Sequence, residues 1–254
     1  MLDPSAPRAA SRSQRSDRSG ESRGKSLDDA TRLSVLARAT VDAIEPDMLL
    51  GLGSGSTAEA VIREIGLRVT AGYSISGVAT SERTARLARE LKIPLHDLND
   101  VRRLDLGIDG ADEIDPELSL IKGRGGALLH EKQVALACDQ LLIVAASEKR
   151  VTALGQRVPL PVEVIPFGWR QTERRLQTLG CQPVLRRTSS ESDAPPFITD
   201  GGHYVVDCAF PANGDLRALG REIKSLTGVV EHGFFFDLAH RALLVDRDGV
   251  VHQL

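Results

Sequence analysis

Acidic and basic side chains gather in one short stretch of the chain, between Asp109 and Glu131. The stretch begins with Asp109-Gly110-Ala111-Asp112-Glu113, continues nine residues later with Lys122-Gly123-Arg124-Gly125-Gly126-Ala127, and ends at Glu131. Carboxylates can take and return a proton, and an ammonium beside a glycine-rich turn can hold negative charge on a carbonyl oxygen. We therefore expect an enzyme that moves protons next to a carbonyl group. A surface loop of solvated acids is the alternative explanation.

An apolar run, Leu104–Ile108, comes directly before the acidic cluster and predicts a buried strand. Asp109 should then lie at the carboxyl end of that strand. Ligands bind at this edge in open α/β sheets. The position of Asp109 therefore favours a binding site over a solvated loop.

A second candidate binding segment lies upstream, where Leu49–Ile62 runs from an apolar strand through a glycine and serine turn into an amphipathic helix. Glycines let the backbone approach a ligand closely, and free N–H groups at a helix start attract an anion. Ser54, Ser56 and Thr57 add hydroxyl donors for phosphate oxygens. The segment is not a dinucleotide fingerprint, because its third glycine comes too early, and it lacks the lysine of a Walker A loop. We expect a small phosphorylated metabolite here, with a ligand-free tight turn as the alternative.

Together these segments resemble ribose-5-phosphate isomerase of type A, over about Asp28 to Gln253. A phosphate loop alone occurs in several sugar-phosphate proteins, whereas the ordered series DGADE, KGRGGA, HEK and LPVEVIP is highly specific. The matching segments are Gly51 to Ala58, Ala79-Thr80-Ser81, Asp109 to Asp115, Ile121 to Ala127, His130-Glu131-Lys132, Ser147-Glu148-Lys149, Leu160 to Pro166, Thr199-Asp200 and Gly228-Val229-Val230.

The resemblance implies an enzyme of the non-oxidative pentose phosphate pathway that interconverts ribose 5-phosphate and ribulose 5-phosphate through a cis-enediolate. Glu131 matches the family's proton acceptor, and Lys122 matches the lysine that holds the oxyanion. Asp109 and Asp112 match carboxylates that bind sugar hydroxyls and assist ring opening. The residues implied to bind the substrate are Ser54, Gly55, Ser56, Thr57, Asp109, Gly110, Ala111, Asp112, Lys122, Gly123, Arg124, Gly125 and Lys149.

No redox cofactor is needed, because this reaction moves hydrogen within one molecule. Cys138, Cys181 and Cys208 are far apart, with no CxxC or histidine pairing, so we expect buried thiols and no tightly bound metal. His130 and His203 have no serine or cysteine partner at a supporting position, and we expect neither to be catalytic. Glu113 is expected to cap a turn.

The chain departs from the family pattern at two places. Many members carry a lysine pair in the first helix that helps to hold phosphate, and the aligned residues here are Leu33-Ser34. Phosphate binding is then expected to depend more on Lys149 and the start of the helix at Ser56, or on Arg32. The family's common TDNGN motif reads Thr199-Asp200-Gly201-Gly202-His203 here, a change that we expect to be structural.

Strands and helices alternate in the first part of the chain, which predicts βαβ units and the α/β class, with a Rossmann-like, mostly parallel sheet. An amphipathic helix is expected first, from a cap near Ser26–Asp29 to Ile44. The elements predicted after it are strand Met48–Leu52, a helix from Ser56, strand Ser74–Ala79, helix Glu82–Leu91, strand Leu104–Asp109, helix Ala127–Ala137 and strand Leu141–Ala145.

Beyond Gly155 the pattern changes to that of a smaller α+β unit of ferredoxin-like type. Its predicted elements are strand Val158–Ile165, helix Trp169–Leu179, strand Cys181–Leu185, an exposed hairpin loop from Arg186 to Pro196, strand Ile198–Val206 and helix Leu216–Leu226. Strands near Val229–Phe236 and Ala242–Val245 are expected to return to the first unit. We therefore expect a Rossmann-like catalytic domain over residues 26–155 and 228–254, and a small domain over residues 156–227.

Residues 1–25 are rich in serine and arginine and carry a net charge of +3, against −3 for all 254 residues. We expect a disordered extension, because this segment has too few apolar residues to bury. It is too short and too poor in aromatics for an RNA-binding arm, so no nucleic-acid partner is expected.

No stretch approaches 18 consecutive apolar residues, and the start lacks the apolar core of a secretory signal. We expect a cytoplasmic protein with no membrane partner. The resemblance further implies a homo-oligomer, with a dimer favoured.

Two other functions stay open at this point. Another sugar-phosphate enzyme, such as an aminosugar-phosphate isomerase-deaminase or a phosphogluconolactonase, would share the glycine-rich loop but not the segments around Asp109 and Lys122. A non-catalytic phosphosugar sensor would not need both of these residues together with Asp112 and Glu131. An assay with ribose 5-phosphate separates these functions.

Overall fold

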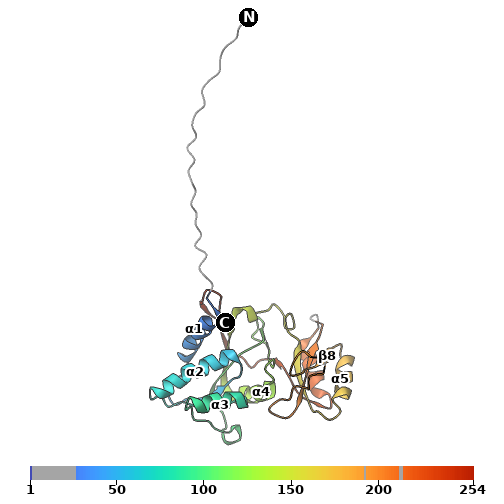
Figure 1. The fold of residues 1–254 in the computed structure, drawn as a ribbon, viewed down its shortest axis with the longest axis horizontal. Coiled ribbons are helices and arrows are strands. Elements are labelled where there is room, and N and C mark those ends of the chain that lie inside the picture. Colours follow the sequence, from blue (N-terminus) through green and yellow to red (C-terminus); the bar gives the residue numbers. More distant parts are fainter. Residues whose placement is uncertain (2–26, 192, 212–213) are drawn as a thin grey trace.

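The computed structural model describes residue 1 and residues 27–191, 193–211 and 214–254. The extension expected over residues 1–25 therefore lies, apart from residue 1, outside the described residues. Helices α1 to α4 gather on one side of the molecule, and α5 with strand β8 lies on the other (Figure 1). The two sides are built on different sheets.

The first side contains a six-stranded sheet in the order β13-β12-β6-β3-β1-β2. Every neighbouring pair is parallel except β12 with β13, which confirms the predicted mostly parallel, Rossmann-like sheet. Its strands are β1 (Leu49–Leu52), β2 (Ser76–Ala79), β3 (Leu104–Asp109), β6 (Cys138–Ala146), β12 (Arg241–Val245) and β13 (Val251–Gln253).

The strand order changes direction between β1 and β3. The chain leaves β1 towards β2 on one side and returns to form β3 on the other side. The loops that follow these two strands therefore diverge, and such a point is where doubly wound sheets bind their ligands. Both segments that carry the candidate chemistry start here, one after Leu52 and the other at Asp109.

Helices cover both faces of this sheet: α1 (Asp29–Val41), α2 (Ser56–Thr70), α3 (Glu82–Glu90) and α4 (Leu128–Ala137). Asp28 caps α1 by accepting the N–H of Thr31 at 2.8 Å, which agrees with the expected helix start. Apolar side chains of α1, α2 and α3 pack in one cluster with alternate residues of β1 and β3, such as Leu50 and Leu106.

Helix α4 lies against the other face, where glycines allow a close approach. A Cβ on Gly51 would lie 2.7 Å from Val134 Cγ1 of α4, and one on Gly107 would lie 2.7 Å from Cys138 Sγ. At these two positions the neighbouring strands present backbone alone. This close packing brings the first turn of α4 to the sheet edge where β3 ends.

The second side is a four-stranded antiparallel sheet in the order β10-β7-β9-β8. Its strands are β7 (Leu160–Val164), β8 (Gln182–Leu185), β9 (Tyr204–Ala209) and β10 (Val229–His232), and its helices are α5 (Trp169–Thr178) and α6 (Leu216–Ser225). The chain order β7-α5-β8-β9-α6-β10 is the βαββαβ arrangement of ferredoxin-like folds, as predicted.

The expected return of Val229–Phe236 to the first sheet is wrong. Strand β10 pairs with β7, and only β12 joins the first sheet. Between them, β11 (Phe234–Phe235) pairs with β5 (Leu120–Ile121) in a small sheet completed by β4 (Glu113–Ile114). Gly233 makes the crossing possible, because a Cβ there would lie 2.2 Å from the Lys122 carbonyl oxygen.

The expected strand Ile198–Val206 is also wrong in its first half. Thr199 and His203 close a turn through the N–H of Thr199 and the carbonyl of His203, at 2.9 Å. Gly202 supplies a positive φ of 79° within that turn, and the regular strand starts only at Tyr204.

Among the described residues, none of the helices has the length and apolarity to cross a membrane.

Candidate active site

Three buried charged side chains meet at the carboxyl edge of the first sheet. The ammonium nitrogen of Lys122 lies 3.0 Å from Asp109 Oδ2 and 3.3 Å from Glu131 Oε1. It also donates a hydrogen bond to the Gly110 carbonyl at 2.6 Å. The exposed fractions of the three side chains are 4% for Lys122, 6% for Asp109 and 7% for Glu131. The structure thus brings together three of the four predicted catalytic residues in direct contact.

Each of the three comes from a different element. Asp109 ends β3, Lys122 follows β5, and Glu131 lies in the first turn of α4. The ring of Phe235 in β11 lies under the Lys122 ammonium, with 5.6 Å from the nitrogen to the ring centroid. The three-stranded sheet of β4, β5 and β11 therefore holds Lys122 next to the carboxyl edge of the six-stranded sheet.

The carboxylate of Asp109 also ties the two candidate loops together. Its Oδ1 accepts the backbone N–H of Ser54 at 3.1 Å and that of Gly110 at 2.7 Å. A Cβ on Gly53 would lie only 2.3 Å from this oxygen. Glycine at this position is therefore required for the loop after β1 to reach Asp109.

Burial and charge set the protonation of the trio. Burial raises the pKa of Glu131 to about 8, and repulsion by Asp109 adds to the increase, while Lys122 opposes it. Burial alone would lower the pKa of Lys122, but attraction by Asp109 and then Glu131 outweighs burial and raises it. One ammonium faces two carboxylates, so it can neutralise only one of them. The raised pKa of Glu131 suits a group that takes and returns a proton near neutral pH.

The second oxygen of Glu131, Oε2, is buried and has no hydrogen-bond partner within the described residues. A buried carboxylate oxygen without a partner is costly to fold and needs an explanation. A substrate C–H group placed next to this oxygen would supply the missing contact.

Asp112, the fourth predicted catalytic residue, is half-buried and does not touch the trio directly. Its Oδ2 accepts the N–H of Arg124 at 2.9 Å, and its own N–H donates to Ile121. A turn closed by the Gly126 N–H and the Gly123 carbonyl follows. Asp112 thus holds the start of the glycine-rich loop, in which Arg124 and Gly125 are exposed and Gly123 and Gly126 are buried.

The loop after β1 presents the start of α2 without a side-chain cap. Gly55 adopts a positive φ of 92° at the N-cap position, and no side chain bonds the first N–H groups of the helix. Ser56 is exposed and Thr57 is half-buried. Uncapped N–H groups at a helix start can bind an anion, which is the kind of ligand expected for this segment.

The hydroxyl of Ser54 is not free for a ligand. It lies 2.8 Å from Thr80 Oγ1 and 2.9 Å from Ser81 Oγ, so it belongs to a hydroxyl cluster between the ends of β1 and β2. Thr80 and Ser81 were not among the candidate site residues. Their signal in the sequence is a pair of hydroxyl residues directly after a predicted strand, at the same sheet edge as Asp109.

Lys149 follows β6 at the same edge and is half-buried. It forms no hydrogen bond or ion pair with any described residue. Arg32, the alternative phosphate cation, is instead engaged: its guanidinium bonds Glu148 Oε2 at 2.7 Å and the Val245 and Asp246 carbonyls. Arg32 therefore holds the segment that carries Lys149, and of these two cations only Lys149 has no partner among the described residues.

Other polar candidates have structural roles. The buried Glu113 accepts the N–H groups of Gly155, Arg157 and Val158, in line with the expected turn-capping role. His203 Nδ1 lies 2.9 Å from the buried Glu163. Within the described residues, no group of three or more His, Cys, Asp or Glu side chains is arranged to hold a metal ion.

Comparison with known families identifies relatives over most of the chain. The family model for ribose 5-phosphate isomerase A (phosphoriboisomerase A) matches residues 76–249. The chain is 47% identical over 215 residues to ribose-5-phosphate isomerase A of Thermomicrobium roseum, which covers 84% of this chain and 90% of that protein. It is 47% identical over 209 residues to the protein of the same name from Bacillus mycoides, with 82% and 92% covered.

Solved structures agree with these relatives. The ribose 5-phosphate isomerase of Plasmodium falciparum superposes with a TM-score of 0.83 at 36% identity, covering 89% of this chain and 98% of that one. A D-ribose-5-phosphate isomerase solved in complex with phospho-erythronic acid superposes with a TM-score of 0.84 at 35% identity, covering 90% and 99%.

Proposed function

The chain belongs to the ribose 5-phosphate isomerase A family, which interconverts D-ribose 5-phosphate and D-ribulose 5-phosphate, and we propose that Glu131 is the base that moves the proton in this reaction. The observation that carries the proposal is the buried, unpartnered Oε2 of Glu131 beside the Lys122 ammonium. A raised pKa near 8 keeps this carboxyl able both to accept a proton and to return it.

In the direction from aldose to ketose, Glu131 removes the proton from carbon 2 of the open-chain sugar. The electron pair of that C–H bond forms the C1–C2 double bond of a cis-enediolate, and the carbonyl π electrons move to oxygen 1. Lys122 stabilises the negative charge there, since it is buried and already held by Asp109 and Gly110. The proton on oxygen 2 passes to oxygen 1, and Glu131 delivers its proton to carbon 1.

Asp109 and Asp112 act on the sugar hydroxyls in this proposal. Asp109 already bonds Lys122 and two backbone N–H groups, so it supplies a fixed acceptor beside the reacting carbons. Asp112 places the loop that starts at Arg124. Both carboxylates can take a hydroxyl proton during ring opening.

The phosphate group binds, we propose, at the uncapped start of α2 over Gly55–Thr57, with Lys149 as its cation. Support comes from the positive φ of Gly55, the free N–H groups of the helix and the absence of a partner for Lys149 in the described part of the chain. The phospho-erythronic acid named in the complex of a relative is an anion of the expected kind.

Further proposals rest on the family resemblance. The enzyme acts in the non-oxidative pentose phosphate pathway, in the cytoplasm, as a homo-oligomer with a dimer favoured, and it needs no cofactor. Its catalytic domain comprises residues 26–155 and the last strands of the chain, and residues 156–227 lie in the small domain.

An assay of purified protein with ribose 5-phosphate tests the activity, with ribulose 5-phosphate formation as the readout. Matched reactions with an aminosugar phosphate and with a phosphogluconolactone test the two rival enzymes. Turnover of ribose 5-phosphate alone supports the proposal, and turnover of a rival substrate alone would refute it.

A further inference from the structure

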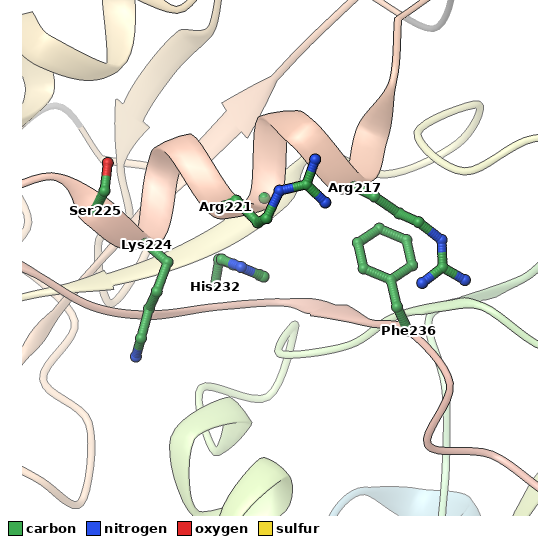
Figure 2. A pocket seen from close by; sticks show the side chains of 7 residues that line it. Arg217, Arg221, Lys224, Ser225, His232 and Phe236 are labelled. Carbon is green, nitrogen blue, oxygen red and sulfur yellow. The ribbon is translucent and has the colours of Figure 1, made fainter.

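A pocket lies in the small domain, between helix α6 and the chain that leaves β10. Its volume is about 410 Å³, and we call it the α6 pocket. It is lined by Arg217, Gly220, Arg221, Lys224, Ser225, His232 and Phe236. In Figure 2 the His232 ring lies between α6 and the strand, with Lys224 on one side of it and Phe236 with Arg217 on the other. None of these residues belongs to the isomerase site described above.

The floor of the α6 pocket carries a hydrogen-bond donor without a partner. His232 is 9% exposed, and its Nδ1 accepts the N–H of Phe234 at 3.3 Å. Burial and, after it, the charge of nearby Lys132 lower the pKa of His232 to about 4, so the ring is neutral, and its proton is on Nε2 because Nδ1 accepts a hydrogen bond. Glu231 Oε1 lies 4.0 Å from Nε2, which is beyond hydrogen-bond distance. The Nε2–H group therefore lines the pocket with no hydrogen bond to a described residue.

Positive charge surrounds this donor. Arg217 is paired with Asp237, with Asp115 and Glu117 further off, and Lys224 is paired with Glu231. Arg221 has no partner among the described residues. Glu231 also accepts from Lys132 at 2.8 Å, so two ammonium groups share one carboxylate.

The shape of the pocket suits a flat apolar group. Gly220 leaves its inner face open, because a Cβ there would lie 3.3 Å from His232 Nε2 and 3.4 Å from Phe234 Cδ2. The Phe236 ring forms one wall; the Arg217 guanidinium lies over it at 4.8 Å from the ring centroid and the Phe234 ring stacks on it at 5.2 Å, so the edge of the Phe236 ring is the part left for a ligand. Cavities of this size, mostly apolar with a few convergent polar groups, are typical of small-molecule sites.

We propose that the α6 pocket is a second binding site, separate from the isomerase site, for a small organic anion with a flat apolar body. The anionic group, a phosphate or a carboxylate, accepts from His232 Nε2 and pairs with Arg221 and Lys224. The flat body packs against Phe236.

The site is connected to the catalytic helix. Lys132 directly follows Glu131 in α4, and it donates to the His232 carbonyl at 2.6 Å and to Glu231. An anion that draws Lys224 away from Glu231 leaves that carboxylate to Lys132 alone. Binding of an anion in the pocket should therefore change the contacts of Lys132 in α4, the helix that carries the catalytic base.

Titration calorimetry with phenyl phosphate tests the site. The unsubstituted protein should bind two molecules per chain, and ribose 5-phosphate should displace only the one in the isomerase site. Arg221→Ser removes the unpaired cation, and Gly220→Ala covers the His232 donor without changing any charge. Each substitution should lower the affinity of the second site for phenyl phosphate about tenfold or more, because a charge-assisted contact is lost or blocked. Arg174→Ser, an exposed arginine on α5, is the matched control and should bind as the unsubstituted protein does.

Displacement of all bound phenyl phosphate by ribose 5-phosphate would overturn the proposal. A second site whose affinity is the same in Arg221→Ser and Gly220→Ala would overturn it too. A changed oligomeric state of Arg221→Ser in light scattering would also overturn it, since the pocket would then be a contact between copies of the chain.

The link to α4 is tested by kcat at saturating ribose 5-phosphate: phenyl phosphate should change kcat in the control but not in Arg221→Ser. An unchanged kcat in both would refute the link. Calorimetry detects phenyl phosphate binding without any turnover. A failure of the binding proposal can therefore be told apart from a failure of the proposed isomerase mechanism.

Discussion

Lys122 Nζ contacts Glu131 through one carboxylate oxygen only, Oε1 at 3.3 Å, while Oε2 stays buried and unpartnered within the described residues. The ammonium therefore holds the carboxylate in place without covering the oxygen that can take a proton. Asp109, at 3.0 Å from the same ammonium, competes for its charge. Burial is the main cause of the raised pKa of Glu131, and the charge of Asp109 adds to it.

The pH dependence of the reaction should report that pKa. The base must be deprotonated to act, and burial followed by repulsion from Asp109 raises the pKa of Glu131 to about 8. Below that pH, kcat/KM should rise about tenfold per pH unit, and above it the value should level off. Replacing Asp109 by Asn removes a like charge, so the inflection of the residual activity should move to lower pH. A profile that is flat between about pH 6 and pH 9 would contradict this assignment.

Lys149→Ala should mainly weaken phosphate binding. Lys149 has no partner in the described part of the chain, so its loss leaves the fold intact, whereas a charge-assisted contact to phosphate is lost. KM should rise by roughly 10- to 150-fold with a smaller effect on kcat. The neighbouring exposed arginine provides the control, and Arg150→Ala should leave KM near its original value. An unchanged KM in Lys149→Ala would assign the phosphate contact to another cation.

Gly53→Ala should disrupt the junction between the two site loops. The added methyl would lie 2.3 Å from Asp109 Oδ1 and 2.5 Å from the Ile108 carbonyl oxygen, so one of the two strands must shift. Overpacking of this kind costs about 1–3 kcal/mol of unfolding free energy, and a displaced Asp109 should also lower kcat. Gly214→Ala, whose methyl meets no atom within 4 Å, is the control. Denaturant unfolding and steady-state kinetics measure both effects, and a Gly53→Ala protein with unchanged kcat would contradict the role of Asp109.

Removal of divalent metal should leave the isomerase activity intact, because the charge of the enediolate is assigned to the Lys122 ammonium. The measurement is kcat/KM after dialysis against a strong chelator, compared with an untreated sample. Loss of activity that one specific divalent ion restores would show that the oxyanion is held by a metal.

The sequence predicts most of what positions the site. Apolar runs identified β1, β3 and β6, and the cluster of charged residues together with the family resemblance identified Asp109, Lys122 and Glu131. Strands β4 and β5 were not predicted, because two-residue strands have no periodicity to detect. Strand β11 was predicted only as the end of one strand near Val229–Phe236, and the structure separates it from β10. The pairing of β10 with β7 depends on partners far away in the chain. Likewise, the hydroxyl of Ser54 is satisfied by Thr80 and Ser81, a contact that only the folded sheet edge creates.

Proton transfer by Glu131 is tested most directly by the Glu131→Gln substitution, with hydrogen exchange as the readout. Glutamine keeps the size of the side chain and cannot accept the substrate proton, so turnover should fall by at least about 100-fold. Binding of the sugar phosphate should persist, since the α2 start and Lys149 are untouched. The unsubstituted enzyme should incorporate deuterium from heavy water at the transferred position of ribose 5-phosphate, and the variant should not. A folded Glu131→Gln protein with near-normal turnover and exchange would show that Asp109 or Asp112 is the base.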